Sequence, residues 1–387
     1  MKNSKFILPI IVISQFCCTS LWFASNGVMT NLLTNFNLDE NAFGYLTSSV
    51  QFGFILGTLL FALFTIVDRF SPSKVFFISA LLGSIFNLGL LFENQNLYSL
   101  LIFRFLTGFF LAGIYPVGMK IATDYFDKGL GKSLGFLVGA LVLGTALPHL
   151  LKNIFIDFSW KFVLISTSIL AFIGGLLMLI FVKNGPFRKP SKTLDIFVSY
   201  KIFKNTNFRK AAFGYFGHMW ELYTFWAFVP VLLSIYEEKN VNINFNTPIL
   251  SFVIIAVGGF SCVIGTYISQ KNGVKKMAFN FLLLSCFCCL ISPFMFQTNE
   301  IIFILFLLFW GMVVIADSPL FSTLVAQNAP QKEKGTALTI VNCIGFSITI
   351  ISISILNSIH TIFDSNFIFM ILAIGPILGL FSLKKIL

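Results

Sequence analysis

The sequence has little charge. Only 11% of its 387 residues are Asp, Glu, Lys or Arg, whereas a soluble globular chain carries about 25%. Charge this sparse is too little to cover a water-facing surface of this size. By contrast, 57% of the residues are hydrophobic, and 50 of them are phenylalanine. The sequence therefore predicts an integral membrane protein.

Several kinds of chemistry are also missing. The sequence contains no phosphate-binding Walker loop and no His-Glu-x-x-His pair, so an ATP-driven pump and a membrane metallohydrolase lack their motifs. A sensor would normally carry a soluble domain, and the loops here are short. The cysteines lie inside apolar runs without a nearby His or acid, which favours small buried hydrophobes over disulfides or metal ligands. These cysteines are Cys17, Cys18, Cys262, Cys286, Cys288, Cys289 and Cys343. We expect no enzyme activity, no cofactor and no metal.

Long apolar runs recur from one end of the chain to the other. A membrane-spanning helix needs about 20 apolar residues, and continuous rather than alternating runs indicate helices, not a β-barrel. Runs that continue along the whole chain are also unlike a removable signal peptide. The sequence predicts an all-α membrane protein with twelve transmembrane helices, at 6–31, 42–67, 75–92, 97–123, 133–151, 160–182, 209–235, 248–269, 278–296, 301–325, 336–357 and 365–383.

The one long polar break divides the chain into halves. It covers 183–208 and is rich in Lys, Pro, Ser and Asn. We predict an N-terminal six-helix bundle at 1–182, a linker at 183–208 and a C-terminal six-helix bundle at 209–387.

The charges outside the spans predict the orientation. The side with both termini and the linker has 21 basic and 5 acidic residues, against 3 basic and 8 acidic on the other side. Because positive loops stay in the cytoplasm, we expect both termini to be cytoplasmic, in the inner or plasma membrane. The net charge of +11 then reflects topology, and nucleic acid is not needed as a partner. We expect a monomer in the lipid bilayer.

An internal repeat supports the two halves. A shift of 203 residues aligns a glycine and a proline of the fourth span with a pair of the same separation in the tenth: Gly108 and Pro116 with Gly311 and Pro319. Two halves in the same orientation form a parallel repeat, which is typical of transporters that rock around a central site.

These features resemble the major facilitator superfamily over the whole chain. The fourth span is similar to the family signature Arg-x-x-x-Gly-x-x-x-Ala, at Arg104, Gly108 and Ala112, followed by Pro116. The resemblance implies two pseudo-symmetric six-helix bundles and transport by alternating access.

Two further motifs resemble the family in part. The turn after the second span has Asp68 and Arg69 where the family has Gly-x-x-x-Asp-Arg-x-Gly-Arg-Arg, a loop that acts in conformational change, although three of its other positions differ. The fifth span partly matches a glycine- and proline-rich signature of antiporters but lacks its Gly-Pro pair. We expect the small residues and the proline of the fourth and fifth spans to pack helices together, at Gly108, Ala112, Pro116, Gly135, Gly139 and Gly144.

The seventh span contains two ionisable groups. A charged group costs about 2.5–3.5 kcal/mol inside a membrane, so each is a functional candidate. His218 and Glu221 are three residues apart and share a helix face. Glu221 lies about 18 Å from the start of the span at 1.5 Å per residue. Burial disfavours its charge, so Glu221 is a candidate proton carrier with His218 as partner or relay. The alternative is a structural hydrogen bond to a neighbouring span.

Two other spans also contain ionisable groups. Arg104 cannot readily lose its proton, so it needs an acidic partner or an anionic ligand. The family resemblance places it in the central cavity with a role in proton coupling, and the alternative is a structural ion pair. Asp317 lies near Pro319, so it is either a cavity acid or a hydrogen-bonding group at a helix break.

The first span has a polar stripe that would be costly to expose to lipid. In the family, spans one, four, seven and ten line the cavity, and these spans have the polar groups described above. The alternative is that the stripe joins helices. The candidate cavity residues are Gln15, Trp22, Asn26, Arg104, Tyr215, His218, Glu221, Trp310 and Asp317.

These observations favour a secondary transporter for a small polar or anionic solute, with protons as the coupling ion and alternating access as the mechanism. Arg104 and a weaker resemblance to permeases of the cyanate type favour an anion. The alternative is a proton-coupled exporter of drugs or metabolites with the same fold.

Overall fold

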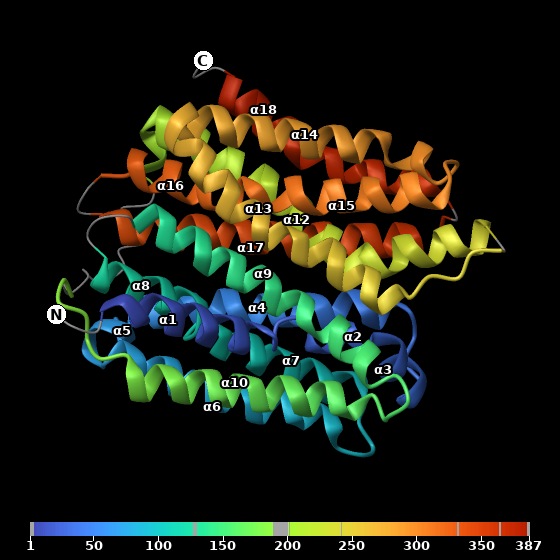
Figure 1. Ribbon diagram of the computed structural model, residues 1–387, viewed down its shortest axis with the longest axis horizontal. Coiled ribbons are helices and arrows are strands. Elements are labelled where there is room, and N and C mark those ends of the chain that lie inside the picture. The colour runs from blue at the N-terminus through green and yellow to red at the C-terminus, as the bar shows by residue number, and fades with distance from the viewer. Residues whose placement is uncertain are drawn as a thin grey trace. The chain divides into compact units, whose positions relative to one another are not determined.

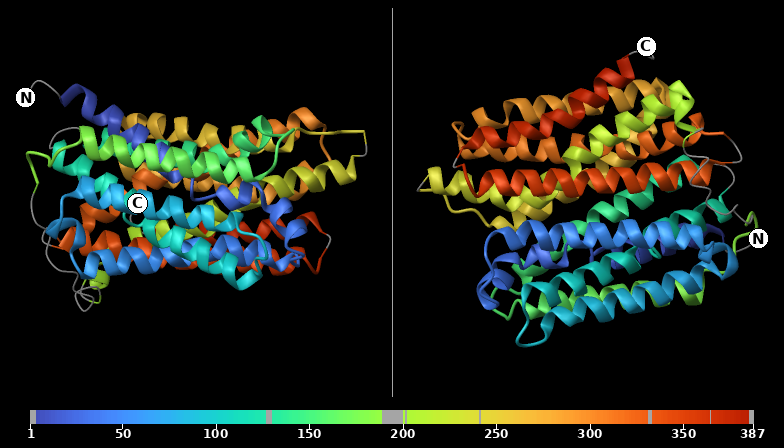
Figure 2. Two further views of the ribbon diagram at one scale, coloured as in Figure 1. Left: turned by 90° about the horizontal axis from the view of Figure 1, so that it is seen from below. Right: turned by 180° about the vertical axis from the view of Figure 1, so that it is seen from behind.

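Nearly all of the described structure is helical. The computed structural model describes residues 4–126, 130–188, 200, 202–240, 242–330, 333–363 and 365–384, and within these ranges there is no β-strand. The predicted linker 183–208 falls partly outside the described residues, at 189–199 and 201. The chain divides into two units, Met1–Asp195 and Ile196–Leu387. Within each unit the long helices run alongside one another (Figure 1; Figure 2).

The first unit contains the helices of spans one to six. They are α1 (Ser4–Thr19), α2 (Ala24–Gly27), α3 (Met29–Asn35), α4 (Asn41–Leu63), α5 (Ile66–Arg69), α6 (Pro72–Leu88) with the 3₁₀ turn η1 (Gly89–Leu91), α7 (Leu97–Leu111), α8 (Tyr115–Tyr125), α9 (Leu130–Ile154) and α10 (Lys161–Phe181).

The second unit contains the helices of spans seven to twelve. They are α12 (Thr206–Lys239), α13 (Thr247–Asn272), α14 (Val274–Met295), α15 (Glu300–Ala316), α16 (Ser318–Asn328), α17 (Lys334–His360), the 3₁₀ helix η3 (Asn366–Ala373) and α18 (Ile374–Lys384).

Among the described residues, eleven of the twelve predicted spans are long and apolar enough to cross a membrane. Each of these eleven is either one helix or a run of consecutive helices. The first span differs because its main apolar helix ends at Thr19, and the chain continues through the short helices α2 and α3. The all-α fold with twelve spans is therefore confirmed. Large apolar side chains are exposed along the helices of both units, as a bilayer requires; they include Phe52, Ile102, Phe260 and Leu305, which are 55%, 58%, 65% and 59% exposed.

The two units repeat one packing pattern. In the first, α1 packs against α9 and α10, and α4 packs against α7. In the second, α12 packs against α17 and α18, and α13 packs against α15. The shift of 203 residues also superimposes the bounds of α8 on those of α16.

Prolines place a break in the fourth and the tenth span. Pro116 is the second residue of α8, and Pro319 is the second residue of α16. Proline has no N–H to donate and disfavours a helical residue before it, so a helix tends to end just before it. The break therefore recurs at the same point in both halves.

Candidate functional site

A buried carboxylate lies at the centre of the second unit. Glu221, on α12, is fully buried. Its Oε1 accepts a hydrogen bond of 2.6 Å from Nε1 of Trp310 on α15, and its Oε2 accepts one of 2.8 Å from the hydroxyl of Ser285 on α14. Three helices thus converge on one acid through uncharged donors.

His218 lies one turn earlier on α12 and has a different partner. Its Nδ1 is 2.8 Å from Oδ1 of Asp317, and both side chains are almost fully buried. The sequence suggested His218 as a partner or relay for Glu221. Although the two share a helix face, each of them meets a different residue of the tenth span. Tyr215 lies next to this pair, with its ring centre 6.0 Å from that of His218.

Asp317 lies at the break between α15 and α16. Pro319 cannot donate to the Ile315 carbonyl, and the Cys262 thiol donates to it instead, at 3.5 Å. Among the described residues, the Asp317 carboxylate caps no backbone N–H of α16 and faces His218. The role of Asp317 as a cavity acid stays a prediction.

The first unit has a fixed cation in place of the acids. Arg104, on α7, is fully buried. Its Nη1 donates to the Leu21 carbonyl at 3.1 Å and its Nη2 to the Trp22 carbonyl at 2.5 Å. These carbonyls lie where α1 has ended and α2 has not begun. The sequence predicts an acid or an anionic ligand for Arg104; within the described residues, the guanidinium binds the backbone of the broken first span.

A buried asparagine extends this contact to three helices. Asn87, on α6, accepts from Arg104 Nη1 at 3.5 Å. Its amide donates to the Thr167 and Ser168 hydroxyls of α10, at 3.2 and 2.9 Å. Neither Asn87 nor Ser285 is among the candidate residues predicted from the sequence. Both are polar residues inside an apolar span, which is the signal that could have drawn attention to them.

The polar stripe of the first span lies inside the first unit. Gln15 is fully buried beside Gly118 of α8, and the Asn26 amide donates to the Thr47 hydroxyl of α4 at 2.9 Å. Trp22 is fully buried, with its ring centre 4.7 Å from that of Phe54. The amide of Asn26 thus joins two helices of the first unit, and a place for the stripe in a cavity stays a prediction.

The candidate packing residues allow close approach between helices. A Cβ on Gly108 would meet the backbone of Val50 on α4, and one on Gly144 would meet the backbone of Phe16 on α1. Gly135 and Gly139 are buried on α9, and Ala112 lies against Gly57 at the end of α7.

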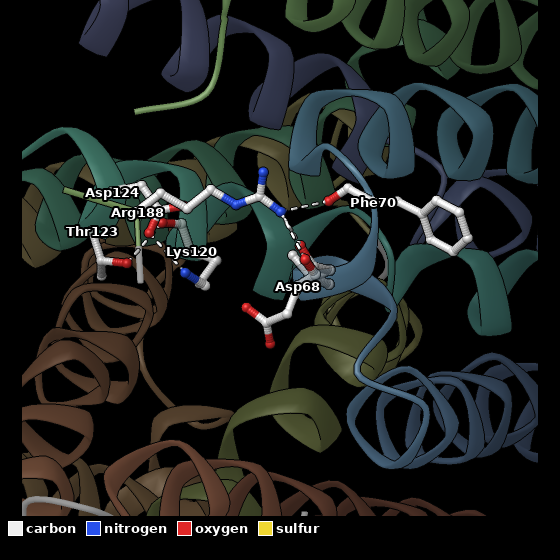
Figure 3. A network of polar contacts seen from close by, with 7 residues as sticks. Asp68, Phe70, Lys120, Thr123, Asp124 and Arg188 are labelled. Atoms are coloured by element: carbon white, nitrogen blue, oxygen red, sulfur yellow. Dashed lines mark hydrogen bonds and ion pairs between the residues drawn. The ribbon is translucent and has the colours of Figure 1, made fainter. Parts of the chain in front are cut away.

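The turn after the second span is held by an arginine outside the motif. Nη2 of Arg188 donates to the carbonyls of Asp68 and Phe70, each at 2.9 Å, as Figure 3 shows. The neighbouring Arg69 donates from Nε to the Thr65 hydroxyl at 3.2 Å. The backbone of the motif is therefore fixed to the segment that follows α10.

Comparison with known proteins decides the family. The model of the Major Facilitator Superfamily matches residues 11–354. The chain belongs to this superfamily. It is accordingly a membrane transporter and not an enzyme, and the resemblance in the sequence is confirmed.

Solved structures of other superfamily members share its fold. A mutant form of the nucleoside transporter NupG has a TM-score of 0.74 at 14% identity, over 99% of this chain and 99% of that one. The proton:xylose symporter XylE, bound to 6-bromo-6-deoxy-D-glucose, has a TM-score of 0.70 at 16% identity, over 99% of this chain and 96% of that one.

One curated relative matches part of the sequence of this transporter. The niacin transporter NiaP of Acinetobacter baylyi is 31% identical over an alignment that covers 35% of this chain and 36% of that protein. The chain thus spans about a third of the length of the curated relative that it matches.

Proposed function

We propose that this transporter couples the movement of a small polar or anionic organic solute to protons, with Glu221 as the main coupling acid. One observation carries the proposal: the Glu221 carboxylate is fully buried in the seventh span and accepts hydrogen bonds from the uncharged side chains of Trp310 and Ser285. A carboxylate without a neighbouring cation is neutralised most readily by a proton. Uptake of a proton then changes the charge of the second unit by one.

The pair of His218 and Asp317 gives the proton a second position nearby. The Nε2 atom of His218 is buried and has no hydrogen-bond partner among the described residues, while its Nδ1 faces Asp317. Imidazole can take up a proton on one nitrogen and release it from the other. We propose that the pair of His218 and Asp317 can hold a proton one turn of α12 away from Glu221.

The class of solute rests on charge and on the partial relative. Within the described residues, the Arg104 guanidinium binds carbonyls and an amide oxygen, so no carboxylate neutralises its charge. A buried positive charge in a medium of low dielectric constant attracts anions over several ångströms. The relative is a niacin transporter, and niacin is a small carboxylic acid. We propose a small organic anion of this kind as the solute.

The test is transport by purified protein in liposomes. A ligand screen by thermal stabilisation, with niacin and other small carboxylates as probes, first identifies a solute that binds. We expect Glu221→Gln to abolish solute accumulation driven by a pH gradient while exchange of solute across the membrane persists. Glu238→Gln, at the exposed end of the same helix, is the matched control and should accumulate solute normally. If Glu221→Gln still concentrates the solute when only a pH gradient is imposed, Glu221 is not the coupling acid.

The orientation is part of the same proposal. Because positively charged loops stay in the cytoplasm, we propose that both termini are cytoplasmic. The membrane is then the inner or plasma membrane of the cell. Tags on the two termini should both be inaccessible to an impermeant reagent in intact cells. Labelling of either terminus from outside would contradict this topology.

A further inference from the structure

A groove opens on the second unit between the first turns of α12 and the last turns of α18. It has a volume of about 370 Å³ and is lined by Arg209, Lys210, Phe213, Phe381 and Ser382. The Ser382 hydroxyl donates to the Lys210 carbonyl at 3.2 Å, which fixes the two helices together at the groove. This groove contains none of the residues assigned above to proton coupling.

Positive charge gathers at one end of the groove. Arg209 is exposed, and its Nη1 donates to the Phe203 carbonyl at 3.3 Å. Lys210 is the next residue along α12, is partly buried and lines the same groove. Cations held together in this way repel each other, and an anion placed among them relieves the repulsion.

The groove becomes apolar one turn further along α12. Phe213 follows Arg209 by four residues and so lies on the same side of the helix. Its side chain is 49% exposed, and that of Phe381 on the facing helix is 66% exposed. The cations lie in the first turns of α12, and the exposed aromatic rings lie one turn further into the membrane span. This order matches that of a phospholipid, in which a phosphate is followed by acyl chains.

We propose that this groove binds an anionic phospholipid, whose phosphate lies between Arg209 and Lys210 and whose acyl chain lies against Phe213 and Phe381. Free inorganic phosphate shares the headgroup chemistry but would leave both rings uncovered. The bound lipid joins the seventh span to the twelfth at the end where the seventh span begins.

Native mass spectrometry of the purified full chain tests the site. The probes are phosphatidylglycerol, phosphatidylethanolamine and inorganic phosphate, each added separately. We expect the wild type to retain phosphatidylglycerol in preference to phosphatidylethanolamine. The double variant Arg209→Gln/Lys210→Gln should bind phosphatidylglycerol about 30-fold more weakly, which corresponds to about 1 kcal/mol for each basic residue.

The matched control removes two exposed cations from the first unit, by Lys74→Gln/Lys183→Gln, and should bind phosphatidylglycerol as the wild type does. Phe213→Ser/Phe381→Ser tests the acyl contact and should weaken phosphatidylglycerol binding while both cations remain. Equal phosphatidylglycerol binding by the Arg209→Gln/Lys210→Gln variant and the control would overturn the proposal. So would displacement of the lipid by inorganic phosphate at millimolar concentration, or equal retention of the two phospholipids. Transport is not the readout, so failure here leaves the proposed coupling role of Glu221 intact.

Discussion

Replacement of Arg104 separates a structural from a solute-binding role for the buried cation. In the wild type, the guanidinium donates to two carbonyls at the break of the first span, those of Leu21 and Trp22. Arg104→Ala leaves both carbonyls without this donor inside the protein. A hydrogen bond to a charged group contributes about 1.5–3 kcal/mol, so the variant should lose about 3–6 kcal/mol.

Arg104→Lys keeps the charge but not the geometry. One ammonium replaces a planar fork whose two nitrogens bind different carbonyls. We expect lysine to retain one of these contacts, and therefore to lose about half as much stability as alanine. Because the break of the first span would no longer be fixed, both variants should also transport solute poorly.

The assay combines thermal unfolding of the purified protein with uptake at matched expression. A domain of this size loses about 2–4 °C in Tm per kcal/mol, so Arg104→Ala should unfold at least about 6 °C below the wild type and Arg104→Lys should lie between them. Lys120→Ala is the control. Lys120 on α8 pairs with Asp124 one turn away, at 2.7 Å, with its own side chain 22% exposed and that of Asp124 5% exposed, so Lys120→Ala should change transport less than either Arg104 variant does. If Arg104→Ala loses transport with no change in Tm, the guanidinium acts on the solute and the structural argument is wrong.

Two further predictions concern the second unit. Trp310→Phe removes the indole donor from Glu221 but keeps an aromatic ring. Because that donor favours the ionised carboxylate, the pH profile of proton-driven transport should move to higher pH. An unchanged profile would exclude a role for this contact in coupling. Gly311→Ala places a Cβ against the backbone of Ile254, so it should destabilise the protein by about 1–3 kcal/mol in thermal unfolding. Gly335→Ala, where nothing lies within 4 Å of an added Cβ, is its control and should leave stability unchanged or slightly higher; equal effects of the two would contradict the proposed close approach of α13 and α15.

The sequence contains much of the information on the fold. Apolar run length predicted the spans because each helix must satisfy its own backbone in lipid. Pro116 and Pro319 also predicted equivalent positions in the two halves, and α8 and α16 begin one residue before these prolines. Both signals are local, so they can be interpreted without knowledge of packing.

The break of the first span could not be predicted in this way. It falls between Thr19 and Ala24, a stretch with neither proline nor glycine. Its carbonyls are bound by Arg104, more than eighty residues later. A break fixed by a distant side chain leaves no signature in the local sequence.

The candidate site was predictable as a set of residues but not as a set of contacts. Hydropathy identified Glu221, His218 and Asp317 because ionisable groups inside spans are rare. Which of them pair depends on the rotation of α12 relative to the tenth span, and a helix periodicity says only that His218 and Glu221 share a face. The tenth span provides both Trp310 and Asp317, so each group on α12 has its own partner.

The contacts of Arg188 bear on how the chain is assembled during synthesis. Its hydrogen bonds reach back about 120 residues to the turn after the second span, and the neighbouring Phe187 donates to the Asp124 carbonyl at 2.9 Å. Every one of these partners has left the ribosome before Arg188 does. The last segment of the N-terminal bundle is therefore fixed to earlier turns of the same bundle, and these contacts require no residue of the second half of the protein.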